Sequence, residues 1–471
     1  MQKTKIVCTI GPACNDYNTL VAMMKAGMDV ARLNMSHGDL AGHQAVVDLV
    51  KQVRSDLKKP CAIMLDTRGP EIRIGEFKEG KVSLTKGQQF IFTTRKIKGT
   101  EEEVSLRFTK LVELAKPKMH IYANNGLLDF KVVDVTETDI ICKVLTSGVL
   151  SNNKSLALPR VPLNIPYLSK IDKEHIEFAV KNELEIIACS FVNSAEDILS
   201  VRKYLKTLNC DNIDIVSKIE SLAGIKKLDQ IIEVSDGIMV ARGDMGTEVP
   251  MEEIPTIQKM MITKTVNQSK YVIVATEMLE SMIEKRRPTR AETADVANAV
   301  YDNTSATMLS GETASGLYPV EAVTAMDNIA KATEKAIDYN KLFSKKQLPK
   351  SNIRNAIAFS ACATAHALDA KAILCFSHEG NSAKAISSFR PASTIVAITT
   401  EQSVANKLSV CWGITPVVCE IINNTDDMFK KANDIAKELK VAKPGDTIII
   451  TSGVPVNNMG KTNLIKVHVV E

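Results

Sequence analysis

The chain has 471 residues, 45% of them hydrophobic and 24% charged, which is the balance of a globular protein long enough for two or three domains. A net charge of +4 and an aromatic content of 4% disfavour nucleic-acid binding, which needs a basic surface and rings that stack on bases. No apolar run reaches the ~18 residues of a membrane span, so we expect no membrane partner.

The termini and the cysteines indicate a reducing compartment. An apolar strand pattern begins almost at once, at Lys5, which leaves no room for a signal peptide. The ten cysteines form no C-x-x-C pair, and several lie inside apolar runs. We therefore expect a cytoplasmic protein whose thiols are small buried hydrophobic groups.

Eight short apolar segments, separated mostly by stretches of helical pattern, organise the chain. They are residues 5–10, 30–34, 61–66, 186–191, 214–219, 237–242, 272–276 and 306–310. Buried parallel strands read as such runs, and strand–helix alternation repeated eight times predicts a closed (β/α)8 TIM barrel. These barrels carry their chemistry at the C-terminal ends of the strands, where polar clusters follow most of the segments.

The interval between Asp66 and Ile186 is too long for one helix. Alternating apolar and polar residues at 81–84, 89–93, 129–135 and 139–144 predict strands, with glycines between them. The pattern indicates a small β-barrel domain inserted after the third barrel strand, placed to act as a lid over the active-site face. We assign the catalytic barrel to 1–68 and 167–342, and the lid to 69–166.

A second α/β pattern follows the barrel. Helical stretches at 320–339 and 352–368, separated by a polar connection, precede apolar runs at 372–376, 394–399, 415–419, 447–451 and 464–470. They predict a C-terminal α/β domain with an open sheet at 343–471. The loop 377–384 follows a strand and opens a helix, so it is either a backbone cradle for phosphate or an ordinary helix start with Ser382 near the cap.

Two strand ends carry residues suited to an anionic, metal-bound substrate. Lys218 and Glu220 alternate at the fifth strand and can both face the barrel mouth. Glu220 and Asp244, on neighbouring strands, supply two carboxylates to a hard cation such as Mg²⁺ (or Mn²⁺). Gly243 lets a ligand approach the backbone closely. The alternative for each pair is a buried salt bridge at a strand end.

The second and third strands end in a further polar cluster. Arg32, Asn34 and Ser36 alternate on the second strand, and they suit a phosphate oxygen or the shell of a monovalent cation. Asp66 and Thr67 end the third strand and could complete such a shell with oxygen atoms. Several clusters converging on one barrel face favour a functional site over a structural one.

Taken in order, these clusters resemble those of pyruvate kinases. The matching motifs are 5–12 (KIVCTIGP), 31–38 (ARLNMSHG), 65–73 (LDTRGPEIR), 217–220 (SKIE), 236–246 (DGIMVARGDMG), 275–282 (ATEMLESM), 287–292 (RPTRAE) and 308–314 (MLSGETA). The resemblance covers essentially the whole chain. It implies phosphoryl transfer from phosphoenolpyruvate to ADP at the end of glycolysis, with Mg²⁺ and K⁺ as cofactors and usually a homotetramer.

The resemblance also implies roles for individual residues. Glu220 and Asp244 would hold Mg²⁺ against the substrate, and the backbone around Gly243 would receive the substrate carboxylate. Lys218 would neutralise charge on the transferring phosphoryl group and on the enolate. Thr276 would lie on the face of the enolate, in the path of a proton to its methylene carbon.

The remaining implied roles concern K⁺ and the phosphates. K⁺ would be held by Asn34, Ser36, Asp66 and Thr67. Arg32 and Arg73 would contact phosphates, with Arg32 in a catalytic position, and Lys154 of the lid would reach the nucleotide when the lid closes. A glutamate at the position of Glu71 accompanies K⁺ dependence in this family.

The C-terminal loop resembles the family's site for a sugar-phosphate activator. The residues concerned are Ser377, Glu379, Gly380, Asn381, Ser382 and Lys384. The partner segment 451–461 lacks the tryptophan and arginine typical of eukaryotic members that bind fructose 1,6-bisphosphate. The effector is therefore left open between a sugar phosphate and a nucleotide.

The chain departs from the family pattern at a few positions. They are Arg68 for lysine, Ile74 for threonine, Asn124-Asn125 for two aspartates, Arg160 for glycine and Glu277 for glutamine. The changes near the lid put lid closure in question, and Glu277 adds a carboxylate beside Thr276. Two other functions remain as alternatives: another phosphoenolpyruvate-using barrel enzyme, of lyase or mutase type, and a catalytically weak sugar-phosphate sensor. Dependence on ADP separates them from the kinase.

Overall fold

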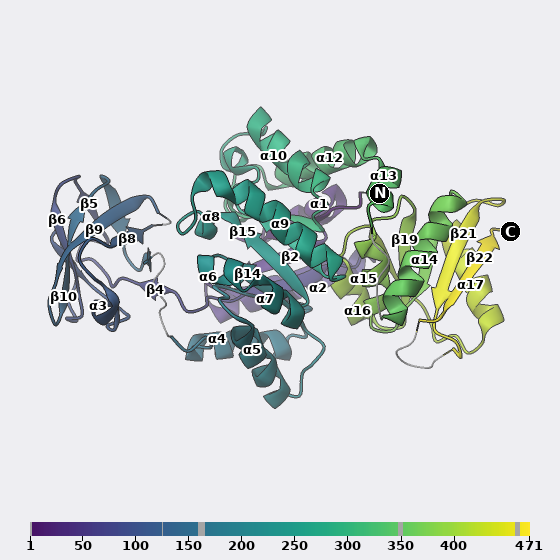
Figure 1. Ribbon diagram of the computed structural model, residues 1–471, viewed down its shortest axis with the longest axis horizontal. Helices are drawn as coiled ribbons and strands as arrows, with labels where there is room; N and C mark the ends of the chain where they lie inside the picture. The colour runs from purple at the N-terminus through teal and green to yellow at the C-terminus, as the bar shows by residue number, and fades with distance from the viewer. Residues whose placement is uncertain (1, 125, 159–164, 347–351, 457–461) are drawn as a thin grey trace.

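A computed structural model describes residues 2–124, 126–158, 165–346, 352–456 and 462–471. Three bodies lie in a row (Figure 1): an all-β insert at one end, a barrel in the middle and an α/β domain at the other end. The predicted fold class is confirmed by this arrangement.

Eight parallel strands close the central barrel. In spatial order they are β1 (Lys5–Thr9), β17 (Ala306–Leu309), β16 (Tyr271–Ala275), β15 (Gly237–Ala241), β14 (Asp214–Ile219), β13 (Ile186–Cys189), β3 (Ala62–Asp66) and β2 (Val30–Asn34). Each lies within a predicted apolar run or differs from it by a residue. Nearly every strand residue is buried, because side chains fill the interior on one face and helices cover the other.

Helices surround the barrel in the expected alternation. The longer ones are α1 (Tyr17–Ala26), α2 (Leu40–Asp56), α4 (Lys170–Lys181), α5 (Ala195–Thr207), α7 (Leu228–Val234), α9 (Ile254–Asn267), α10 (Arg290–Tyr301) and α12 (Pro319–Ala336). Short helices follow three strands: α6 (Leu222–Lys226), α8 (Arg242–Met245) and α11 (Gly311–Ala314). Ser169 and Thr289 begin α4 and α10 with capping boxes, which satisfy backbone N–H groups that a helix start leaves free.

The insert after β3 is built from curled sheets. A seven-stranded sheet has the order β4 (Ile72–Arg73), β12 (Ser155–Ala157), β8 (His120–Ala123), β9 (Leu128–Val135), β10 (Asp139–Val144), β6 (Gln89–Thr93) and β7 (Glu103–Ser105). Its two edges meet through a bridge between Ile74 and Leu106. An antiparallel pair of strands distant in the chain, β5 (Lys81–Leu84) and β11 (Gly148–Ser151), and the helical turn α3 (Leu111–Leu114) complete it.

The C-terminal domain is an open five-stranded sheet between helices. Its order is β20 (Ile414–Val418), β19 (Thr394–Thr399), β18 (Ala372–Phe376), β21 (Thr447–Ser452) and β22 (Leu464–Val469), and only β22 runs antiparallel. Its helices are α13 (Tyr339–Ser344), α14 (Ile353–Ala367), α15 (Asn381–Ser388), α16 (Gln402–Leu408) and α17 (Thr425–Glu438). The predicted strands are confirmed. The polar connection expected after residue 339 begins instead with α13, because Asp338 caps it and Phe343 stacks on Phe359.

The C-terminal domain packs against the end of the barrel opposite the mouth. Lys384 of α15 lies 2.7 Å from Asp214, the first residue of β14, and Lys407 of α16 lies 3.4 Å from it. Arg390 is fully buried, donates to the carbonyl of Asn303 and lies 4.8 Å from the Trp412 ring. One hydrophobic cluster includes residues of the barrel strands and of this domain. The two therefore share a continuous packed region.

Candidate active site

A cavity of about 860 Å³ lies at the barrel mouth, between the strand ends and the insert. Glu220 and Asp244 line it from the barrel, and Glu71, Tyr122 and Leu156 line it from the insert side. Glu220 and Asp244, two of the polar residues expected at the strand ends, therefore face a shared hollow between the barrel and the insert. Partial shielding from water strengthens electrostatic interactions in such a hollow.

The ammonium group of Lys218, near the C-terminal end of β14, is held by three side chains. Its Nζ is 3.1 Å from Asp66 Oδ1 and 2.9 Å from Glu220 Oε1, and it donates a 2.7 Å hydrogen bond to Ser190 Oγ. Burial acts against the Lys218 charge, but the Asp66 and Glu220 carboxylates outweigh it and hold its pKa above the usual value. Lys218 is thus a fixed, permanently charged cation.

Asp66 links Lys218 to a second cation. Arg32 donates from Nε to Asp66 Oδ2 at 2.7 Å and from Nη1 to Thr9 Oγ1 at 2.8 Å. Although burial disfavours its charge, Lys218 and Arg32 hold the pKa of Asp66 below the usual value. The carboxylate thereby orients two cations toward one region of the mouth, an arrangement that suits a phosphoryl group.

Glu220 and Asp244 lie near Lys218, whose single positive charge does not neutralise both carboxylates. Burial is the main cause that raises the pKa of Glu220 to about 8; Lys218 opposes the rise and the nearby Asp244 adds to it. A hard divalent cation between the carboxylates would favour their ionised forms, so this pair fits Mg²⁺. Within the described ranges no cluster of three or more His, Cys, Asp or Glu residues has a metal-binding arrangement. Further ligands would come from substrate and water.

Thr276 and Gly243 meet at the ends of β16 and β15. The backbone N–H of Gly243 donates to Thr276 Oγ1 at 2.7 Å, and that hydroxyl donates to the carbonyl of Ala275 at 2.6 Å. Thr276 and Glu277 both have left-handed backbone conformations, with φ of 69° and 53°. The structure therefore brings the two predicted residues into direct contact, through a turn that is strained for a β-branched side chain.

The residues predicted to hold K⁺ lie at or just beyond the ends of the neighbouring strands β2 and β3. Asn34 is the register partner of Asp66, and its Oδ1 accepts from the backbone N–H of Ser36 at 3.1 Å. Thr67 Oγ1 accepts from the backbone N–H of Ser190 at 3.2 Å. A set made of amide, hydroxyl and carboxylate oxygens fits a monovalent cation.

Cations of the insert lie near Arg32. Burial, and after it the charges of Arg73, Lys154 and Arg32, lower the pKa of His37, so these side chains share its surroundings. Arg73 also donates from Nε to Glu71 Oε2 at 2.7 Å. Arg73, Lys154 and Arg32 thus all act electrostatically on the same histidine.

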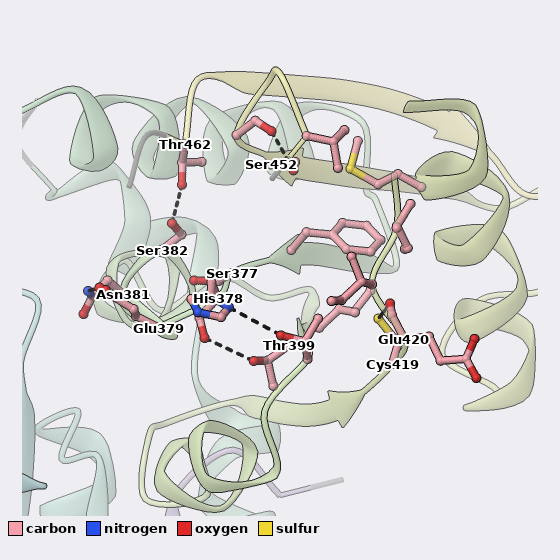
Figure 2. Close-up of a pocket in the computed structure, with 18 of the residues that line it drawn as sticks. Ser377, His378, Glu379, Asn381, Ser382, Thr399, Cys419, Glu420, Ser452 and Thr462 are labelled. Carbon is pink, nitrogen blue, oxygen red and sulfur yellow. Dashed lines mark hydrogen bonds between the residues drawn. The ribbon is translucent and has the colours of Figure 1, made fainter. Parts of the chain in front are cut away.

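A second cavity, of about 440 Å³, lies in the C-terminal domain (Figure 2). Ser377, Glu379, Asn381 and Ser382 line it, as the effector prediction requires, and Ser382 shares a hydrogen bond with Thr462. Gly380 stands at the start of α15 with φ of 81°, where a Cβ atom would come within 2.9 Å of Leu408. A side chain there would be both strained and crowded.

Lys384 does not join this cavity. Its ammonium is directed to the barrel and pairs with Asp214 at 2.7 Å, with its side chain only 13% exposed. The prediction that Lys384 contacts a phosphate is therefore wrong, because its ammonium is paired with the buried carboxylate of Asp214. Among the described residues that line the cavity, Arg354 carries a positive charge.

The sequence analysis assigned no role to several residues that bond the predicted site residues. Ser190 bonds Lys218, Thr9 bonds Arg32, and Arg242 bonds the turn at Thr276. Ser190 had a usable signal, since it stands at the end of a predicted barrel strand. Of the departures near the lid, Asn124 has φ of 53°, while Asn125 and Arg160 lie outside the described residues.

Fold and site together define a class: a (β/α)8 barrel enzyme that acts on an anionic, metal-bound substrate beneath an inserted β domain. Residues 1–323 match the family described as "Pyruvate kinase, barrel domain", and residues 355–468 match "Pyruvate kinase, alpha/beta domain". The chain belongs to the pyruvate kinase family and is a phosphotransferase. Members of this family generally depend on Mg²⁺ and K⁺ and bind phosphoenolpyruvate and ADP or ATP.

Individual relatives agree over the full length. The chain is 42% identical over 473 residues to a pyruvate kinase of Clostridium acetobutylicum, covering 100% of both. It is 44% identical to a pyruvate kinase of Staphylococcus haemolyticus, covering 100% of this chain and 81% of that one. A crystal structure of a pyruvate kinase from Cryptosporidium parvum superimposes with a TM-score of 0.93 at 37% identity, over 100% of this chain and 96% of that one.

The two alternative functions receive no support from these relatives. Among the helices of the described residues, none combines the length and apolar character needed to cross a bilayer.

Proposed function

We propose that the chain transfers the phosphoryl group of phosphoenolpyruvate to ADP, giving ATP and pyruvate. The observation that carries the proposal is the Lys218 ammonium, held by Asp66, Glu220 and Ser190 near the C-terminal end of β14. This geometry suits phosphoryl transfer, which requires a positioned cation beside carboxylates that can bind a metal. The match to the pyruvate kinase family supports the same reaction.

The first step depends on preorganised charge. The transition state of phosphoryl transfer is loose, and negative charge spreads over the oxygens of the moving group. Lys218 and Arg32 are already oriented by Asp66, so they stabilise that charge without reorganisation. Lys218 also stabilises the enolate left when the phosphorus–oxygen bond breaks.

The residues at the strand ends bind the substrate and its cations. Glu220 and Asp244 would hold Mg²⁺ or Mn²⁺, which supplies neutralisation of the substrate carboxylate and phosphate when bound. The backbone at Gly243 would receive the substrate carboxylate. K⁺ would be held by Asn34, Ser36, Asp66 and Thr67.

The second step adds a proton to the methylene carbon of the enolate. Thr276 is the residue assigned to this path, since its hydroxyl is fixed by Gly243 and Ala275 at the mouth. A threonine hydroxyl is a poor acid alone, so it relays a proton and regains one from water. The side chain is unchanged after each turnover.

The insert would complete the site. Arg73 and Lys154 would contact the nucleotide phosphates when the insert closes on the mouth. The observed separation of sheets supports a barrel of 1–68 and 167–342, a lid of 69–166 and an effector domain of 343–471.

Regulation and assembly follow the family pattern in this proposal. A phosphate-bearing effector, either a sugar phosphate or a nucleotide, would bind the C-terminal cavity at Ser377, Glu379, Gly380, Asn381 and Ser382. Arg354 adds positive charge there. The enzyme would act in the cytoplasm as a homotetramer.

The test is pyruvate formation from phosphoenolpyruvate and ADP with Mg²⁺, followed through NADH oxidation by added lactate dehydrogenase. The proposal expects turnover that requires ADP and rises on adding K⁺. Ribose and fructose phosphates and AMP, added singly, identify the effector. Absence of turnover with Mg²⁺ and K⁺ both present would refute the proposed activity.

A further inference from the structure

The turn that carries Thr276 is held by one arginine. Arg242, at the start of α8, donates from Nη2 to the carbonyl of Thr276 at 2.7 Å and to the carbonyl of Glu277 at 3.2 Å. Its Nε also donates to the Thr276 carbonyl at 3.2 Å, and Nη2 lies 2.9 Å from the sulfur of Met278. The guanidinium therefore bonds both residues whose backbone is left-handed.

The arginine is itself oriented by a carboxylate of α10. Arg242 Nη1 donates to Asp295 Oδ1 at 2.8 Å and to Oδ2 at 2.7 Å. The Arg242 side chain is only 11% exposed. Its planar group thus bridges α10 and the turn, in a geometry that a flexible ammonium would not reproduce.

The contact lies at a strained part of the backbone. A β-branched residue at φ of 69° is an outlier that persists only where its surroundings impose it. The imposed conformation directs Thr276 Oγ1 to the N–H of Gly243, the backbone assigned to the substrate carboxylate. The Thr276 hydroxyl is thereby fixed relative to where the substrate lies.

We propose that the Arg242–Asp295 pair is a positioning device that holds the Thr276 hydroxyl for protonation of the enolate. The inference rests on the proposed function and adds to it two residues to which that function assigns no contact with substrate or metal. Loosening the pair lets the strained turn relax and moves the hydroxyl from its line to the methylene carbon. Phosphoryl transfer depends on Lys218 and Arg32, on other strands, and is affected less.

Two readouts separate the steps in full-length enzyme. The first is ATP formation from phosphoenolpyruvate and ADP. The second is exchange of the pyruvate methyl protons with D₂O in the presence of Mg²⁺, K⁺ and ATP, followed by proton NMR. In this exchange a C–H bond of the methyl group breaks and a C–D bond forms, so it reports proton transfer without net phosphoryl transfer.

The first variant, Asp295→Asn, removes the negative charge of the pair and keeps the size of the side chain. The second, Arg242→Lys, keeps the positive charge and removes the planar guanidinium that bonds Asp295 and the turn together. Asp302→Asn is the matched control, because Asp302 follows the same helix and pairs with Lys259 away from the mouth. We expect Asp295→Asn and Arg242→Lys to lower methyl exchange roughly tenfold. ATP formation and KM for phosphoenolpyruvate should change by less than about threefold, and Asp302→Asn should match the wild type.

Each result bears on the inference. Wild-type exchange in both Asp295→Asn and Arg242→Lys would overturn it, and so would an equal loss of exchange and ATP formation, which marks a general structural role. In both cases the proposed function stands, because wild-type turnover is measured alongside. An inactive wild type would overturn the proposed function together with the inference.

Discussion

Replacing Lys384 by methionine tests the ion pair between the barrel and the C-terminal domain. Lys384 Nζ lies 2.7 Å from Asp214 Oδ2, and the two side chains are 13% and 7% exposed. Burial acts against the Asp214 charge, yet Lys384 and Lys407 hold its pKa below the usual value. Removing one partner of a buried pair costs about 3–5 kcal/mol, because a charge stays buried and unpaired. Since Lys407 remains 3.4 Å away, we expect about 3 kcal/mol.

The single tryptophan provides the assay. Trp412 is 3% exposed and lies against Arg390, within the region where the domain packs on the barrel. Urea unfolding followed by Trp412 fluorescence therefore reports loss of this interface. The Lys384→Met variant should unfold at lower urea near neutral pH. Lys371→Met is the control, because its ion pair with Asp369 is exposed, and its midpoint should not move.

The pH dependence has a definite sign. A carboxylate with a lowered folded pKa contributes stability above its unfolded pKa and loses it as pH falls through the folded value. In Lys384→Met, burial with less compensation raises the pKa of Asp214, so its protonation begins at higher pH. The stability deficit should shrink between about pH 7 and about pH 4. Adding Asp214→Asn should recover much of the loss. Equal midpoints for Lys384→Met and Lys371→Met at neutral pH would refute the reasoning.

Three further predictions concern the mouth. Lys218→Met should lower pyruvate formation by at least ~10³-fold with folded protein by circular dichroism, and a rate above a tenth of wild type would contradict its assignment. Glu71→Lys should make the rate independent of K⁺, since the ammonium supplies the missing cation; an unchanged K⁺ response argues against this. Glu277 adds a carboxylate beside Thr276, so Glu277→Gln should shift the pH–rate profile by less than about one unit. Superimposable pH–rate profiles of the wild type and Glu277→Gln would refute this prediction.

Much of the fold could be read locally. Barrel strands are buried on both faces, so segments such as 30–34 and 214–219 appear as apolar runs, and β2 and β14 coincide with them. Strands of the insert such as β10 alternate, because one face is buried and the other solvated. The helix α13 was missed although Asp338 is a local cap signal, because its stacking contact between Phe343 and Phe359 joins two separate helices.

The sequence by itself determined the order of the strands, the insertion after β3 and the identity of the polar residues at the strand ends, since periodicity and spacing carry that information. Only the tertiary structure decided which of those residues meet. Barrel closure brings Ser190 to Lys218, and docking of α15 draws Lys384 to Asp214 and away from the cavity of the C-terminal domain. The contact of Arg242 with the turn at Thr276 is likewise made between distant segments. Such pairings depend on register and on packing between distant segments, and these are properties of the folded chain rather than of any window along it.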